Sequence, residues 1–139
     1  MNILFFLTPK AICSYLLSDY SIRQALERME SSGYANIPVL DREGKYVGTL
    51  TEGDLLWAMK NICGMDLKAA EGHSIKETES RRAYKPVAVT TDIEDLVVTA
   101  TDQNFVPVVD DKNDFIGIVT RRAIMRYCLD TYIKHKADE

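Results

Sequence analysis

The sequence has few of the residues that hold metals or form disulfides. Its 139 residues include three cysteines and two histidines. Cys13, Cys63 and Cys128 are widely spaced, so we expect reduced and mostly buried thiols. A structural zinc site needs four clustered ligands, whereas His73 and His135 lie 62 positions apart. We therefore expect no metal site and no required cofactor.

Long apolar runs and an excess of positive charge are also missing. The run from Ile3 to Leu7 is too short to span a membrane and follows no cationic leader, so we expect a cytoplasmic protein without a membrane partner. Lysine and arginine number 17 against 21 acidic residues, which gives a net charge of −4. This balance does not favour a nucleic acid polymer as partner, so any anionic ligand needs a local group of cations.

Motifs of the common catalytic classes are absent as well. The chain has no nucleophile elbow, no phosphate-binding Walker loop, no distinctive carboxylate pair and no cluster centred on histidine. What is present is the composition of a folded domain, with 46% hydrophobic and 27% charged residues. We expect one compact, non-catalytic module.

An internal repeat with a spacing of 69 positions organises the chain. The segment that begins at Tyr34 recurs from Gln103, with apolar residues conservatively exchanged between the identical ones. The identical pairs are Pro38 and Pro107, Val39 and Val108, Asp41 and Asp110, Gly48 and Gly117, and Thr51 and Thr120. Two copies of one structural unit are therefore expected to share a core.

Each copy predicts the order strand, helix, strand, strand, helix. Short apolar runs around a polar turn predict hairpins with strands over 37–40 and 46–50, and over 106–109 and 115–119. Ser21 and Asp92 are expected to cap the helices before the hairpins. Brief strands are expected before these helices, over 14–17 and 86–89, and the final helices of the copies begin near Thr51 and Thr120.

The predicted fold class is α+β, with two β-α-β-β-α repeats related by a pseudo-twofold axis. We divide the chain into a first repeat over 1–62, a linker over 63–82 and a second repeat over 83–139. Within the linker, 66–71 predicts a short helix. The polar run over 76–82 predicts a solvated helical face with i,i+4 ion pairs.

The duplicated pattern resembles the cystathionine-β-synthase (CBS) domain. The shared motif reads Pro-Val-x-Asp, followed by apolar-Gly-x-x-Thr-x-x-Asp, and the two copies cover nearly the whole chain. The resemblance implies a stand-alone tandem pair, also called a Bateman module. It also implies two clefts between the copies, of the kind that often holds an adenine-containing nucleotide.

Thr51 and Asp54 are the first candidate binding residues. A threonine followed three residues later by an acid is typical of a helix cap, so the pair could serve the helix alone. The resemblance implies a second role, in which Asp54 holds the two ribose hydroxyls of a nucleotide. Both interpretations stay open.

The second copy departs from the motif at the matching segment, which runs from Thr120 through Arg121 and Arg122 to Ala123. Two cations in a first helical turn oppose the helix dipole, which favours an anion such as phosphate at this place. Exposure to solvent, or pairing with nearby acids, is the alternative. Because position 123 is alanine, the resemblance implies that only one cleft retains the ribose-binding acid, so the clefts are not equivalent and one nucleotide per chain is expected.

Family geometry implies further contacts through the main chain. In the cleft of Asp54, the base would lie against Lys85, Gln103 and Asn104. The corresponding positions of the other cleft are Ser14, Tyr34 and Ala35.

Two apolar helical stripes suggest self-association. Each is wider than one small sheet needs, so part of each is expected to bury a partner. The stripes consist of Leu55, Leu56, Met59 and Ile62, and of Ile124, Met125, Cys128, Leu129, Tyr132 and Ile133. The resemblance implies a homodimer through the C-terminal helices of each repeat.

The predicted function is regulatory. AMP, ADP or ATP would bind between the repeats and bias an interface that an effector protein recognises. Two alternatives stay open. The Thr-Arg-Arg segment is similar to that of stand-alone CBS pairs that bind cyclic di-AMP, and a structural or dimerisation module with vestigial clefts would show no binding.

Overall fold

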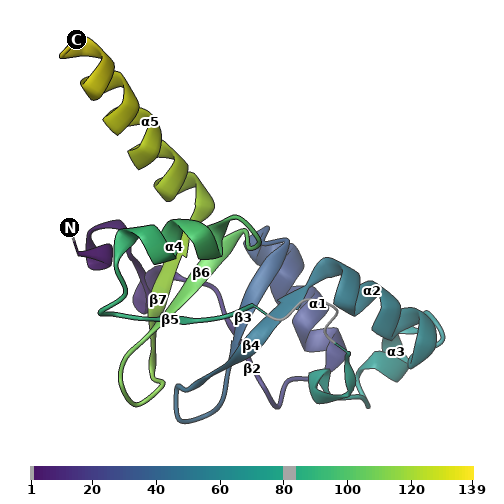
Figure 1. The fold of residues 1–139 in the computed structure, drawn as a ribbon. Helices are drawn as coiled ribbons and strands as arrows, with labels where there is room; N and C mark the ends of the chain where they lie inside the picture. Colours follow the sequence, from purple (N-terminus) through teal and green to yellow (C-terminus); the bar gives the residue numbers. More distant parts are fainter. Residues whose placement is uncertain (1, 80–83) are drawn as a thin grey trace.

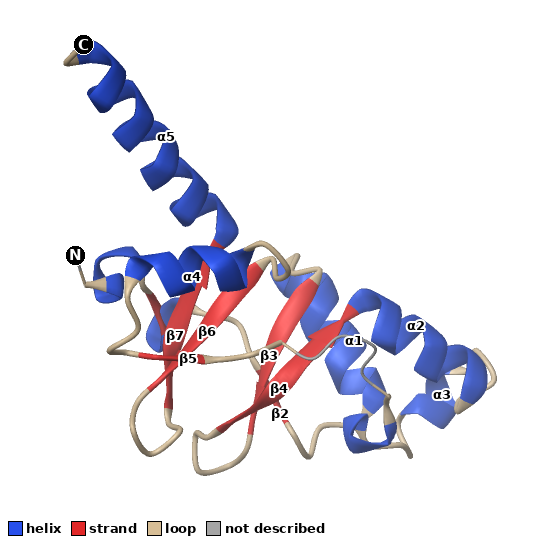
Figure 2. Cartoon of the chain, in the orientation of Figure 1, coloured by secondary structure: helices blue, strands red, loops and turns tan. Residues whose placement is uncertain are grey.

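The computed structural model describes residues 2–79 and 84–139, which form two small sheets with helices packed on them (Figure 1, Figure 2). The first repeat consists of β2 (Leu16–Leu17), α1 (Ile22–Ser32), β3 (Asn36–Leu40), β4 (Tyr46–Thr51) and α2 (Glu52–Asn61). The second consists of β5 (Val87–Ala88), α4 (Ile93–Ala100), β6 (Phe105–Val109), β7 (Phe115–Thr120) and α5 (Arg121–Ala137). The predicted order of elements is confirmed, and the hairpin strands agree within one residue.

Strand pairing is the same in both repeats. The short first strand runs parallel to the next one, and the hairpin is antiparallel, as in β2–β3–β4 and β5–β6–β7. Each hairpin shifts register once, between Val39 and Leu40 and between Val108 and Val109. No sheet among the described residues runs through both repeats, so each forms its own layer.

The predicted N-caps explain where the first helices begin. The Ser21 hydroxyl accepts the Gln24 amide at 3.0 Å, and the Gln24 side chain accepts the Ser21 amide at 2.8 Å, which completes a capping box. Asp92 accepts the Asp95 amide at 2.9 Å at the start of α4. Helix α1 ends at Gly33, whose φ of 72° suits a residue without a side chain.

Backbone bonds across the two hairpin turns mark the twofold axis. Lys45 and Asp114, which are 69 positions apart, form an isolated antiparallel bridge. The Tyr46 amide donates to Asn113 O at 3.1 Å, and the Phe115 amide donates to Gly44 O at 3.0 Å. Tyr46 and Phe115 are equivalent in the repeat, and so are Gly44 and Asn113, because each pair is 69 positions apart. The two bonds are therefore equivalent, and the pseudo-twofold arrangement is confirmed.

Aromatic side chains continue this interface into the molecule. The Tyr46 and Phe115 rings, also 69 positions apart, stack with centroids 6.3 Å apart. They belong to a buried cluster between the sheets, separate from the core of each repeat. The Tyr46 hydroxyl lies 2.7 Å from the Thr49 hydroxyl, and burial raises the pKa of Tyr46 to about 12.

The N-terminal segment packs on the second repeat, although the division at residue 62 assigns it to the first. A 3-10 turn over Ile3–Phe6 places the fully buried Ile3 in the core of the second repeat. Strand β1 (Thr8–Pro9) then pairs antiparallel with β7, next to Gly117. The sequence did not predict this strand, and the division into repeats stays a prediction.

The linker is only partly helical. Helix α3 (Leu67–Ala70) confirms the short helix expected over 66–71. The helical face expected over 76–82 is wrong in its described part, because a single 3-10 turn over Ile75–Glu77 ends at the extended Thr78. The Ser74 capping box fixes this short turn, and residues 80–82 lie outside the described residues. No described helix is long and apolar enough to cross a membrane.

Candidate functional site

Thr51 and Asp54 form a complete capping box at the start of α2. The Thr51 hydroxyl accepts the Asp54 amide at 3.0 Å, and the Asp54 carboxylate accepts the Thr51 amide at 3.0 Å. Asp54 is buried, with 3% of its surface exposed. The helix-cap interpretation is therefore confirmed, whereas the ribose role stays a prediction.

Loss of this cap should lower stability. Asp54→Ala removes the return bond to the Thr51 amide, which should cost about 1–2 kcal/mol and lower the melting temperature by several degrees. Glu52→Ala is the matched control, because Glu52 is an exposed acid in the same first turn. Thermal unfolding followed by circular dichroism checks the difference. Equal melting temperatures for the two variants would contradict a stabilising capping box.

Helix α5 begins with only half of that arrangement. The Thr120 hydroxyl accepts the Ala123 amide at 3.1 Å, but Ala123 returns no bond. Instead, Arg121 Nε donates to Ala100 O at 2.9 Å, and Arg121 Nη2 lies 3.5 Å from Thr101 O. Both carbonyls belong to the negative end of α4, where a cation is favoured. The two arginines thus differ: Arg121 is held against α4, and Arg122 is exposed.

Gln103 ties the segment before β5 to the loop before β6. Its side-chain oxygen accepts the Lys85 amide at 2.7 Å, and its nitrogen donates to Lys85 O and Phe105 O, both at 3.2 Å. The neighbouring Asn104 amide donates to the Tyr84 hydroxyl at 3.0 Å. Lys85, Gln103 and Asn104 therefore lie together, as the resemblance implies, and the amide group of the buried Gln103 is committed to the main chain.

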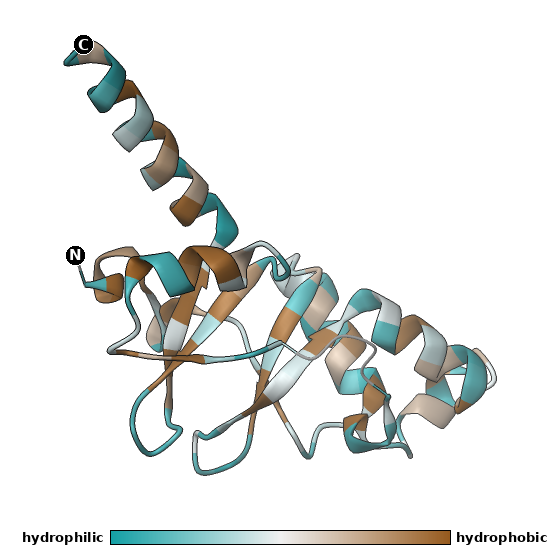
Figure 3. Cartoon of the chain, viewed as in Figure 1, coloured by the Kyte–Doolittle hydropathy of each residue, from teal (hydrophilic) through white to brown (hydrophobic). Residues whose placement is uncertain are grey.

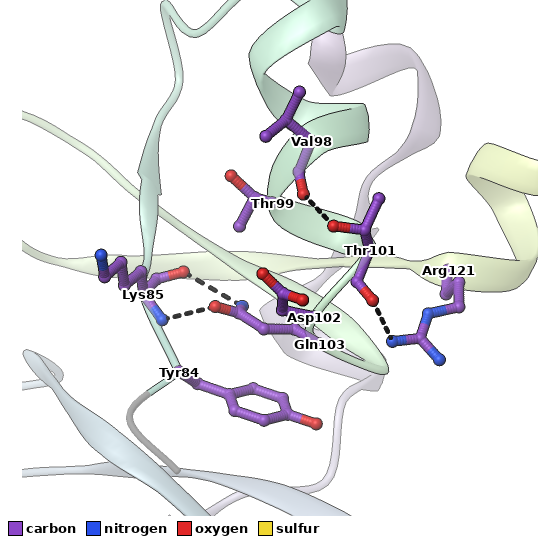
Figure 4. A pocket seen from close by; sticks show the side chains of 8 residues that line it. All are labelled: Tyr84, Lys85, Val98, Thr99, Thr101, Asp102, Gln103 and Arg121. Atoms are coloured by element: carbon purple, nitrogen blue, oxygen red, sulfur yellow. Dashed lines mark hydrogen bonds between the residues drawn. The ribbon is translucent and has the colours of Figure 1, made fainter.

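These elements line an open cavity of about 700 Å³ (Figure 4). Its lining residues are Tyr84, Lys85, Val98, Thr99, Thr101, Asp102, Gln103 and Arg121. The volume lies within the range of small-molecule sites in proteins. Two cationic residues, Lys85 and Arg121, and one acidic residue, Asp102, contribute to the wall.

Asp54 lines a different and smaller cavity, of about 290 Å³. The other residues around it are Trp57, Ala58, Asn61, Ile62, Glu77 and Glu79. We expected Lys85 and Gln103 to lie in the cleft of Asp54. The structure instead places them in the cavity that Arg121 lines. The reason is topological: β6 and β7 are neighbours in one sheet, and the Arg121 amide donates to Asn104 O at 2.9 Å.

The equivalent positions of the first repeat have the same main-chain arrangement. The Glu52 amide donates to Ala35 O at 2.9 Å, as the Arg121 amide donates to Asn104 O. Tyr34 packs partly buried against the core of the first repeat, and Ser14 is also half-buried. Neither these three residues nor Thr51, Asn104, Thr120 and Arg122 line the two cavities described above.

Sequence reasoning missed several residues of the larger cavity. Thr99, Thr101 and Asp102 come from the end of α4 and the segment after it. The only feature of the sequence that could have indicated them is their position directly before the candidate Gln103. Only the fold shows that Arg121 reaches this segment across the sheet end.

The family model for the CBS domain matches the chain twice, over residues 8–61 and 79–130. The chain belongs to the CBS domain family. The two matches cover both structural repeats, so this is a tandem CBS pair.

Larger proteins contain segments similar to this CBS pair. The A-adding tRNA nucleotidyltransferase of Aquifex aeolicus is 31% identical over 113 residues, which cover 81% of this chain and 13% of that protein. Inosine-5'-monophosphate dehydrogenase of Methanocaldococcus jannaschii is 29% identical over 112 residues, which cover 78% of this chain and 20% of that protein. The CBS pair thus spans a fifth or less of these relatives.

Solved structures of similar length share the fold. CbpB in complex with c-di-AMP superimposes with a TM-score of 0.85 at 19% identity, over 100% of this chain and 91% of that one. Listeria monocytogenes CbpB in complex with c-di-AMP gives 0.82 at 23% identity, over 95% and 97%. CBSX2 in complex with AMP gives 0.74 at 25% identity, over 94% and 98%.

Proposed function

We propose that this CBS pair is a regulatory module that binds an adenine nucleotide, with the phosphate held by Arg121 in the larger cavity. The observation that carries the proposal is that Arg121 and Lys85 line the same cavity, of about 700 Å³. Its physiological output would be a change at a surface that an effector protein recognises, without catalysis. We further propose a cytoplasmic location.

The position of Arg121 suits phosphate binding. A guanidinium group has five N–H donors, and among the described residues only two carbonyls accept from Arg121. Three donors are left for a ligand. The bonds to Ala100 O and Thr101 O hold the side chain in place before binding, which reduces the entropy lost on binding. Arg121 is therefore the proposed phosphate ligand, and Arg122 is not.

AMP-type nucleotides and cyclic di-AMP are the two candidate ligands. Similar CBS pairs have been solved in complex with each. Both ligands present adenine, ribose and phosphate, so both fit the proposed use of Arg121. Asp54 stays proposed as the ribose ligand of a nucleotide bound in the smaller cavity, with Thr51 nearby.

Arg121→Ala tests the phosphate site. Loss of a charged hydrogen-bond partner should weaken AMP binding roughly tenfold to hundredfold and flatten its salt dependence. Arg122→Ala removes the same charge from the adjacent exposed position and should change affinity less than about twofold. Calorimetric titration measures both, at a temperature where circular dichroism shows each variant folded. Equal losses in the two variants, or none in Arg121→Ala, would refute the assignment.

We also propose a homodimer, mainly through α5. Leu55 and Met59 of the first predicted stripe are buried in the core of the first repeat, so within this stripe mainly Leu56 is exposed to a partner. In α5, Ile124 is buried, whereas the remaining residues of the predicted stripe are exposed. These are Met125, Cys128, Leu129, Tyr132 and Ile133.

A further inference from the structure

The second repeat lacks an acid in the first turn of its final helix but has one in its cavity. Ala123 occupies the position that Asp54 occupies in the first repeat, and it carries no group that can accept a hydroxyl hydrogen bond. Asp102, in the segment between α4 and β6, lines the same cavity as Arg121. A carboxylate is therefore present near the proposed phosphate site, supplied by a different element.

The neighbours of Asp102 fix its place between the two cationic residues. On one side, Thr101 O accepts Arg121 Nη2 at 3.5 Å. On the other side, the Gln103 side chain holds the main chain of Lys85 at 2.7 Å. Figure 4 draws the Asp102 carboxylate between these two contacts. A ligand that reaches from Lys85 to Arg121 thus passes Asp102.

Three polar side chains of the cavity wall are already engaged. The Thr99 hydroxyl donates to Asp95 O at 3.0 Å, and the Thr101 hydroxyl donates to Val98 O at 2.7 Å. The Gln103 oxygen accepts the Lys85 amide. Within the described part of the chain, the exposed Asp102 carboxylate makes no hydrogen bond or ion pair. Among the described residues that line this cavity, Asp102 is the strongest free acceptor.

We propose that Asp102 accepts hydrogen bonds from the ribose hydroxyls of the nucleotide whose phosphate Arg121 binds. The inference rests on the proposed function. Two vicinal hydroxyls are two donors, and a carboxylate has two oxygens to receive them. A carboxylate repels phosphate, so the ligand must keep its sugar diol apart from its phosphate. A ribonucleoside 5'-phosphate meets this condition, whereas a 3',5'-linked cyclic dinucleotide retains only one free hydroxyl per ribose.

The test compares AMP with 2'-deoxy-AMP in calorimetric titrations of the full chain. The unmodified protein should bind AMP at least about tenfold more tightly than 2'-deoxy-AMP, because the deoxy sugar retains only its 3'-hydroxyl and one carboxylate oxygen of Asp102 loses its donor. In Asp102→Ala and Asp102→Asn this ratio should fall toward one. Asp111→Asn is the matched control, since it removes one exposed acid outside the cavity, and it should keep the parental ratio.

Each outcome decides a separate question. AMP binding that depends on Arg121 but does not discriminate against the deoxy sugar overturns the role of Asp102 and leaves the proposed function standing. If both Asp102 variants keep the parental preference for AMP over 2'-deoxy-AMP, the role of Asp102 is likewise overturned and the proposed function stands. Failure of the unmodified protein to bind AMP overturns both proposals.

Discussion

Gly117→Ala should lower the melting temperature by about 5–10 °C, whereas Gly48→Ala should leave it nearly unchanged. Gly117 lies in β7 opposite Pro9 of β1, with a φ of 154° that side chains rarely adopt. A methyl group there would meet the carbonyl oxygen of Thr8 and lie 2.9 Å from the Leu7 side chain. Because backbone cannot yield as a flexible side chain does, β1 must shift.

Gly48 is the matched control for this experiment. It occupies the same position of the repeat, but no heavy atom lies within 4 Å of a methyl group added there. Within the described ranges, no strand equivalent to β1 pairs with β4. Thermal unfolding measures the stability of both variants, and limited proteolysis reports whether the N-terminal segment is released. Equal melting temperatures would contradict the packing of β1 on β7.

Leu129→Glu should disrupt the proposed homodimer and leave a monomer. Helix α5 extends away from the sheets, and apolar residues appear along its length (Figure 1, Figure 3). Met125, Leu129, Tyr132 and Ile133 are each more than half exposed. A charge at the centre of this stripe, buried in a dimer without a partner, costs several kcal/mol.

Thr131→Glu controls for the added charge. Thr131 is exposed on the opposite side of the same helix, so this variant should remain dimeric. Size-exclusion chromatography with light scattering gives the mass of each variant at micromolar concentrations. A monomeric unmodified protein, or a dimer that survives Leu129→Glu, would contradict assembly through α5.

The repeat made most of the fold predictable from the sequence. Identical residues such as Pro38 and Pro107 fix the two hairpins in equivalent positions, and Ser21 and Asp92 mark helix starts through local hydrogen bonds. Strand β1 was not predictable, because two residues outside the repeat carry no periodic pattern. Its only signal is the need for glycine at 117, which depends on a contact distant in the sequence.

The sequence indicated several residues of the candidate site but not which of them share a cavity. The sequence singles out Lys85, Gln103 and Arg121, and the structure places all three around one cavity. These three residues lie around one cavity because Gln103 bonds to Lys85 and Arg121 bonds to the end of α4. Side-chain contacts of this kind depend on strand order and rotamers, which no local pattern encodes. For the same reason, the sequence did not indicate Asp102.

Calorimetric titration of the unmodified chain with AMP and with adenosine tests the central claim most directly. Both ligands offer the same base and the same ribose diol, so their difference isolates the phosphate that Arg121 is proposed to bind. The account predicts saturable binding of AMP, at least about tenfold tighter than that of adenosine at low salt, with the difference narrowing as salt is added. Equal affinities for the two ligands, or no binding of AMP, would contradict it.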